Sequence, residues 1–192
     1  MIAYAALRIK KSRQQFDTVE LSEIIDISPE DNPTFEAIRQ SDDIVYSFEF
    51  AQEDIDRAPK EIAQYSAPSY IPPQFTMVDE AYVPTQQNRV YLDEAGNVLM
   101  FLQCVLWQYE TDPNDPAGVA RVVGVNAENA TVEDVVLQGY EVKIFRIPTP
   151  IGTEDMVVVW TDHEYFYSLT LPSVANKEID RIIGSMTPVE PK

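Results

Sequence analysis

The chain has 192 residues and a mass of 21.8 kDa, which fits one domain, or one domain with a short arm. Its 14 Lys and Arg residues against 32 Asp and Glu give a formal net charge of −18, which argues against a nucleic-acid partner because phosphate binding depends on Lys and Arg. One Cys and one His argue against disulfide frameworks, structural zinc and Cys–His catalysis, and no apolar run reaches the ~20 residues that span a bilayer.

The chain opens with a short apolar segment followed by a basic cluster, all of it before the first acid, Asp17. The basic residues are Arg8, Lys10, Lys11 and Arg13. Two interpretations stay open for residues 1–13. The segment is either the tail of a membrane helix or signal segment that begins upstream, or a surface helix whose apolar residues pack on the domain at helical spacing.

The next part of the chain predicts short helices and one strand. Turn formers end at Pro33, which can open a helix over residues 34–39. Residues 44–50 alternate as a strand does, and residues 52–64 start with acids, as a helix N-terminus prefers, until Pro59 kinks or ends that helix. We therefore predict a unit over residues 1–66 that consists of a helical arm and an extension with one strand.

From residue 74 onward the pattern becomes a series of strands separated by turns. Residues 98–107 and 156–160 are apolar on both alternating faces, which is typical of strands in the middle of a sheet. Gly96 offers the positive φ that a short hairpin loop needs. The predicted strands cover residues 75–82, 89–92, 98–107, 120–125, 131–137, 140–147, 156–160 and 165–171.

The last predicted element is an amphipathic helix, capped by Ser173 or Asn176. Its apolar stripe is formed by Ile179, Ile182, Ile183 and Met186. Strands joined by turns, with helices gathered at both ends of the chain, predict an α+β fold. We expect a curved antiparallel meander of about six to eight strands, with helices near the N-terminus and one C-terminal helix. The sheet domain should span residues 67–188 and form one compact unit with the extension before it.

Five pieces of the second half follow one another in a recognisable order and spacing. They are YIPPQF at 70–75, YLDEAGN at 91–97, QGYEV at 138–142, VVWT with YFYSL between 158 and 169, and KEIDRIIGSM at 177–186. Together they resemble the domain-of-unknown-function family 4367, which is common in Gram-positive bacteria. Gln74 stands where that family often has Gly, so the turn after the prolines is expected to differ.

The resemblance implies a location and a class of function. In that family the domain usually lies outside the membrane behind a single N-terminal membrane helix, and some members have a cytoplasmic part that resembles anti-sigma regulators. Residues 1–13 would then follow such a helix, and a nearly Cys-free acidic body suits that side of the membrane. The family has no established activity, so the resemblance supplies no catalytic residue.

His163 and residues 112–118 are the first candidates for chemistry. His163 lies in an Asp-His-Glu turn between two predicted strands, whereas a general base works in a water-poor cleft, so a surface turn is the favoured interpretation. Residues 112–118 have some features of a calcium loop, but Pro116 and Gly118 fall at the wrong offsets. A plain acidic loop is favoured there.

Acidic pairs and the single thiol are the other candidates. Paired carboxylates hydrolyse glycosides only at a set separation in a cleft, and 32 acids make chance pairs inevitable. Cys104 lies in a strand that is apolar on both faces and should behave as a small hydrophobe. We therefore expect no enzyme activity, metal or cofactor, and a hydrolase is the weakest hypothesis. The neighbouring residues considered are Asp31 with the amide Asn32, and the acidic groups Asp42–Asp43, Glu53 with Asp54 and Asp56, and Glu133–Asp134.

The aromatic residues allow two interpretations. They fill the core and cross-strand pairs, which is favoured, or some of them line a concave sheet face that holds a ligand. The candidate ligand face consists of Tyr70, Tyr91, Trp107, Tyr109, Tyr140, Trp160, Tyr165 and Tyr167. The favoured function is an extracytoplasmic binding, sensory or accessory domain linked to anti-sigma or envelope signalling, with a protein, peptide or envelope ligand as partner. The alternative is a peptide or lipid carrier, or an inhibitor module, that uses the aromatic face.

Overall fold

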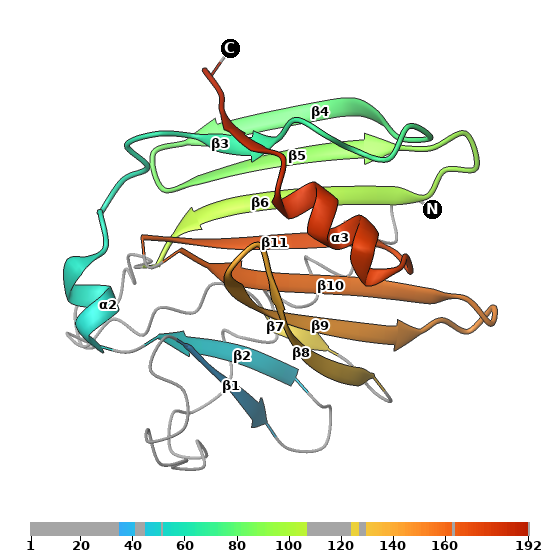
Figure 1. Cartoon of the computed structure of the whole chain (residues 1–192), viewed down its shortest axis with the longest axis horizontal. Coiled ribbons are helices and arrows are strands. Elements are labelled where there is room, and N and C mark those ends of the chain that lie inside the picture. Colours follow the sequence, from blue (N-terminus) through green and yellow to red (C-terminus); the bar gives the residue numbers. More distant parts are fainter. Residues whose placement is uncertain are drawn as a thin grey trace.

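The computed structural model describes residues 35–40, 45–50, 52–106, 124–126, 130–162 and 164–191. Antiparallel sheet dominates them (Figure 1). The largest sheet has seven strands in the order β4-β5-β6-β11-β10-β9-β8. These strands are β4 Thr76–Val83, β5 Gln86–Leu92, β6 Val98–Val105, β8 Thr131–Leu137, β9 Tyr140–Pro148, β10 Glu154–Thr161 and β11 Tyr165–Pro172. The predicted antiparallel α+β fold class is confirmed in this coarse form.

The seven-stranded sheet consists of two meanders joined edge to edge. β4, β5 and β6 form the first meander, and β8 to β11 form the second. They meet where β6 pairs antiparallel with β11, with Cys104 opposite Phe166. The sequence predicted one continuous meander, and the difference arises because β6 pairs with a strand far along the chain rather than with the strand that follows it.

Two smaller sheets accompany the large one. β1 Phe35–Gln40, β2 Val45–Phe50 and β7 Gly124–Asn126 form one in the order β1-β2-β7. β3 Ser66–Pro68 and β12 Met186–Pro188 pair antiparallel to form the other. The helix predicted over residues 34–39 is wrong, because that segment is β1, paired with β2 along its whole length. Pairing with another strand overrides the local helix signal of Pro33. Residues 1–13 lie outside the described residues.

Most predicted strand positions agree with the observed strands within a few residues. The predicted strand over 120–125 is described only at its end, as β7. α2 covers Gln52–Arg57, so it is shorter than the helix expected over 52–64 and ends before Pro59, as a proline requires. None of the helices in the described residues is long and apolar enough to cross a bilayer.

Helix α3, Asn176–Ile183, lies across one face of the large sheet, called the front face below (Figure 1). Its Ile179, Ile182 and Ile183 are buried in the same core cluster as sheet residues of β6, β10 and β11. Met186, predicted for the same stripe, lies in β12 and packs against this core. Apolar spacing therefore placed Ile179, Ile182 and Ile183 on the buried stripe of the helix correctly, and it was wrong for Met186, which lies beyond the end of α3.

The predicted caps of α3 are wrong. The helix begins after Ala175, which makes no side-chain cap. Ser173 and Asn176 instead hydrogen-bond to the sheet, Ser173 Oγ with Glu154 Oε2 at 3.2 Å, and Asn176 Oδ1 with Nη2 of Arg146 at 2.8 Å. Arg146 thus fixes the start of α3 on β9, and this tertiary contact replaces a local cap.

The middle of the sheet is buried on both faces, as the sequence predicted for β6 and β10. On the front face Phe101, Val158 and Leu169 are fully buried. On the opposite face Val159 and Phe166 are fully buried as well. The predicted boundary at residue 66 stays a prediction, and Ile62 packs in the same core cluster as residues of the sheet domain.

Candidate functional site: a buried polar row

A single row of side chains crosses the front face from one edge of the sheet to the other. Each member lies opposite the next in the strand register. The row begins with polar side chains on the first meander and becomes aromatic and then aliphatic on the second. It runs through Tyr82, Gln87, Gln103, Tyr167, Trp160, Val142 and Val135.

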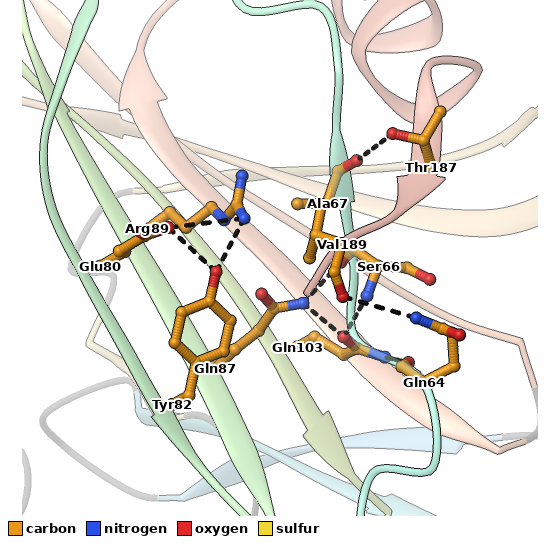
Figure 2. A network of polar contacts seen from close by, with 10 residues as sticks. All are labelled: Gln64, Ser66, Ala67, Glu80, Tyr82, Gln87, Arg89, Gln103, Thr187 and Val189. Atoms are coloured by element: carbon orange, nitrogen blue, oxygen red, sulfur yellow. Dashed lines mark hydrogen bonds and ion pairs between the residues drawn. The ribbon is translucent and has the colours of Figure 1, made fainter. Parts of the chain in front are cut away.

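Gln87 and Gln103 form the centre of the polar half. Both side chains are fully buried, and Nε2 of Gln87 donates to Oε1 of Gln103 at 2.5 Å (Figure 2). The backbone of Ser66 in β3 hydrogen-bonds to both of them: its N–H donates to Gln103 Oε1 at 2.9 Å, and its carbonyl accepts from Gln87 Nε2 at 2.6 Å. The two amides therefore hold β3 against the sheet.

Arg89 forms a second polar group beside these amides. Its Nη2 donates to the Tyr82 hydroxyl at 2.8 Å and lies 3.5 Å from Oε2 of Glu80. The Tyr82 hydroxyl in turn donates to the same Glu80 oxygen at 2.9 Å, so the three side chains close a triangle (Figure 2). The side chains of Arg89 and Glu80 are only 12% and 17% exposed. The positive charge of Arg89 and the negative charge of Glu80 therefore balance each other.

The charges of this group are fixed near neutral pH. Burial lowers the pKa of Arg89, but hydrogen bonds to Tyr82 and Tyr91 outweigh burial and the pKa is raised overall. Burial raises the pKa of Tyr91 above its usual value. Arg89 therefore stays charged and Tyr91 stays protonated, whereas a general acid or base titrates near the working pH. The arrangement is suited to hydrogen bonding rather than to proton transfer.

One polar atom of the amide pair and one of the Arg89 group have no partner among the described residues. They are Oε1 of Gln87 and Nε of Arg89, and both are buried. Native proteins pair most buried polar atoms with protein or water. The two atoms are therefore the places where the row can accept one more hydrogen-bonding group.

β3 and β12 together form a clasp over the polar row, defined here as residues 64–70 and 185–189. Ser69 N–H donates to the Ser185 carbonyl at 2.9 Å, and Val189 N–H donates to the Tyr65 carbonyl at 2.8 Å. Tyr70 N–H donates to Oγ of Ser185 at 3.0 Å. Each end of the clasp is thus fastened by backbone hydrogen bonds between segments that are far apart in the sequence.

Four of the rings predicted for a ligand face are buried. Tyr91, Trp160, Tyr165 and Tyr167 belong to the core cluster of the front face. The Trp160 and Tyr167 rings are stacked, with centroids 5.2 Å apart and an interplanar angle of 12°. The hydroxyl of Tyr165 accepts from the Ala63 N–H at 3.1 Å. These rings pack the interior in the way that the favoured interpretation of the sequence expected.

The other rings of the predicted face have different surroundings. Tyr70 is half-buried, with the Arg181 guanidinium 3.6 Å from its ring centroid and a hydrogen bond from its hydroxyl to Glu178. Tyr140 is exposed at the β8–β9 turn. Trp107 and Tyr109 lie outside the described residues. The structure therefore does not bring the eight rings together on one open face among the described residues.

The remaining candidates carry no catalytic arrangement that the described residues reveal. Glu133 accepts from Nδ2 of Asn176 at 2.9 Å, and Asp134 pairs with Nζ of Lys143 at 2.6 Å. Burial raises the pKa of the Cys104 thiol well above its usual value. Within the part of the chain that the structure describes, no three His, Cys, Asp or Glu side chains are grouped as metal ligands. Outside the described residues lie His163, Asp31–Asn32, Asp42–Asp43 and residues 112–118.

Sequence reasoning missed the polar row. Gln103 is the one polar side chain in the apolar run over residues 98–107. Gln87 lies opposite it on the neighbouring strand β5, and Arg89 follows two positions later on the same face. A lone amide in such a run was the available signal, because a buried amide requires a partner. The partner, Ser66, could not be identified without the fold.

Comparison with known proteins adds no identity to this description. No protein-family model matches the sequence, and no curated protein matches it significantly. The resemblance to family 4367 accordingly stays a prediction.

Proposed function

We propose that the protein is a binding domain that acts by contact with a protein or peptide, as a sensory or accessory part of a membrane-anchored bacterial protein. The observation that carries the proposal is an exposed apolar side chain at a bulge in an edge strand. β4 ends the large sheet, and its register with β5 shifts between Met77 and Asp79, which leaves Val78 unpaired. Val78 is 54% exposed.

A bulge on an edge strand redirects a side chain and alters pairing locally. Away from the bulge, the backbone of an edge strand offers a template on which an extended partner can form hydrogen bonds. Met77 and Val83 on the same strand are exposed too. β4 therefore combines backbone and apolar side chains in the form that strand-adding ligands use.

The opposite edge of the sheet has a similar composition. β8 is the other end strand, and its Val136 is 72% exposed while Val132 is also exposed. Both edges are therefore candidate contacts. The carrier alternative draws less support, because it needs an open aromatic face and most of the described candidate rings are buried.

The location is a separate part of the proposal. The resemblance to family 4367, the net charge of −18 and the single Cys support a domain outside the membrane, connected through residues 1–13 to an upstream helix. Protease treatment of intact cells that produce the full-length protein with a C-terminal tag tests this location. Tag cleavage from outside is the expected result. Protection in intact cells, with cleavage after lysis, would overturn the location and leave a cytoplasmic binding domain.

Photo-crosslinking in cells tests the contact function itself. A photoreactive amino acid is placed at Val78, at Val136, or at Glu94 as the control, because Glu94 is exposed in the β5–β6 hairpin loop. We expect a discrete crosslinked species from Val78 or Val136 and none from Glu94. The same yield of crosslinks at all three positions would contradict a specific contact at a sheet edge.

A further inference from the structure

Two unpartnered polar atoms lie at neighbouring positions on the front face of β5. Gln87 and Arg89 are two residues apart on one strand, so their side chains project from the same face. Oε1 of Gln87 and Nε of Arg89 are buried and have no hydrogen-bond partner among the described residues. One atom is an acceptor and the other is a donor.

The orientation of the Gln87 amide is dictated by its neighbours. Ser66 N–H is an unambiguous donor, so the Gln103 atom that accepts from it must be the amide oxygen. Gln103 Oε1 and the Ser66 carbonyl are both acceptors, and each receives a hydrogen bond from the nitrogen of Gln87. A flipped Gln87 amide would place its oxygen against two other acceptors. Oε1 therefore faces away from Gln103, toward the side where Arg89 and Tyr82 lie (Figure 2).

Charge decides which kind of group fits between the two atoms. Arg89 is already balanced by Glu80 at 3.5 Å, with both side chains largely buried. An added anion or cation would be an uncompensated buried charge, which is strongly unfavourable. The group must therefore be neutral, must donate to Gln87 and must accept from Arg89. An oxygen that carries a hydrogen has both capacities.

Spacing decides the size of the group. The Cα atoms of residues two apart on a strand lie roughly 6–7 Å apart, so polar groups that project from the same face at these positions have a comparable spacing. One oxygen with a hydrogen bond of about 2.9 Å to each side bridges atoms up to about 6 Å apart. A single water molecule meets both requirements, and buried waters typically bond to polar groups that lack protein partners.

We propose that the protein binds one internal water molecule between Gln87 Oε1 and Arg89 Nε, beneath the clasp of β3 and β12. This water donates to the amide oxygen and accepts from the guanidinium. It thereby links the amide pair that holds β3 to the Arg89–Glu80–Tyr82 triangle that holds β4. The inference goes beyond the proposed function and holds whether or not the sheet edges bind a partner.

A crystal structure of the full chain at about 1.5 Å resolution or better tests the site directly. We expect one isolated density peak within about 2.6–3.2 Å of both atoms. Two outcomes overturn the proposal. Absence of a peak, with the two atoms in direct contact or bonded to other protein groups, removes the site. Continuous density larger than one oxygen replaces the water by an organic ligand.

Water–protein NMR cross-relaxation provides the solution counterpart. The Arg89 Nε–H is the probe, and the side-chain amide of Gln64, which is exposed, is the matched control. We expect cross-relaxation between water and the Arg89 Nε–H with the sign that indicates a residence time of nanoseconds or longer. At Gln64 we expect only the signal of short-lived water contacts. Equal, short-lived contacts at both groups would contradict a bound water even if a peak is present in the crystal.

Discussion

At the scale of single residues, Tyr167 joins the polar and apolar halves of the row of side chains that crosses the front face. It lies opposite Gln103 on one side and Trp160 on the other. Its hydroxyl donates to Oδ2 of Asp162 at 2.6 Å. Burial raises the pKa of Tyr167, and the negative charge of Asp162 and their hydrogen bond raise it further. The folded state therefore holds this proton far more tightly than the unfolded chain does.

That difference makes stability depend on alkaline pH. An unfolded tyrosine loses its proton near the usual tyrosine pKa of 10.0, so the contribution of Tyr167 is complete below pH 10 and falls as the pH rises above it. We expect Tyr167→Phe to reduce the alkaline loss of unfolding free energy by up to about 1.4 kcal/mol per pH unit. Urea denaturation at several pH values between about 8 and 11 measures it. An unchanged slope in Tyr167→Phe would contradict the assignment.

The aromatic residues also mark what could be predicted at this scale. Alternating apolar residues correctly indicated that Trp160 and Tyr167 lie in strands, and burial followed from their position in the middle of the sheet. The hydrogen-bond partners could not be predicted in the same way. Gln87 and Gln103 are held by Ser66, and no local pattern specifies which backbone group from a distant segment will be brought to a buried amide.

At the scale of elements, the β8–β9 turn fastens the end of α3. Gln138 occupies this turn with a φ of 52°, a left-handed conformation that is strained for a residue with a side chain. Its Nε2 donates to Oδ1 of Asp180 at 3.0 Å. Gly184 follows α3 with an ordinary φ of −67°, yet a Cβ there would lie 2.9 Å from Cδ of Gln138. Close contact, rather than backbone freedom, explains this glycine.

We expect Gly184→Ala to destabilise the fold by about 0.5–1.5 kcal/mol, because the Gln138 amide must move and give up its hydrogen bond. In a Gln138→Gly background the same substitution should cost nothing, since the obstructing side chain is gone. A double-mutant cycle in urea measures the coupling between the two positions. The idea fails if Gly184→Ala costs the same free energy in both backgrounds.

The clasp gives a second expectation at this scale. Removal of residues 186–192 deletes β12, so β3 loses its paired strand and the buried amides lose their cover. We expect the free energy of unfolding to fall by at least about 2 kcal/mol, the cost of leaving buried polar groups without partners. Removal of residues 190–192 alone is the control and should have little effect, because β12 and the Val189 hydrogen bond remain. Equal urea midpoints for the two truncations would contradict a stabilising clasp.

Element type was more predictable than element pairing. The strands of the large sheet follow from short-range alternation of apolar and polar residues, and α3 follows from its apolar stripe. The helix predicted over residues 34–39 was wrong because β1 owes its conformation to β2. The pairing of β6 with β11 could not be predicted from local sequence either, because it depends on which distant strand supplies the hydrogen bonds.

At the scale of the whole molecule, like-charge repulsion is the dominant electrostatic feature. The net charge is −18, and several of the described basic groups are already paired with carboxylates. These are Arg57, Arg89, Lys143 and Arg146. The acids outnumber the basic residues by 18, and the folded state concentrates that negative charge in a smaller volume than the unfolded chain.

We expect the melting temperature to rise as NaCl is increased from about 10 mM to about 300 mM, because the screening length shortens several-fold over this range. The same screening weakens surface ion pairs, but this costs little stability because each pair contributes only about 0–1 kcal/mol. A variant with the exposed acids Glu94, Glu141 and Glu164 changed to Gln should melt higher at low salt and respond less to NaCl. A melting temperature that falls with salt would show that attractive pairs outweigh repulsion.

The order in which the strands join has a consequence for folding kinetics. Each meander is made of neighbours along the chain and can form from local contacts, whereas Cys104 and Phe166 at the junction are 62 positions apart. The pairing of β3 with β12 closes a longer loop still, because Ala67 pairs with Thr187, 120 positions later. Loop-closure entropy makes such distant pairings late events. During folding the two buried glutamines therefore keep their Ser66 partner in a lasting way only after β12 has paired with β3, so the first meander passes through a stage in which its buried amides are open to water.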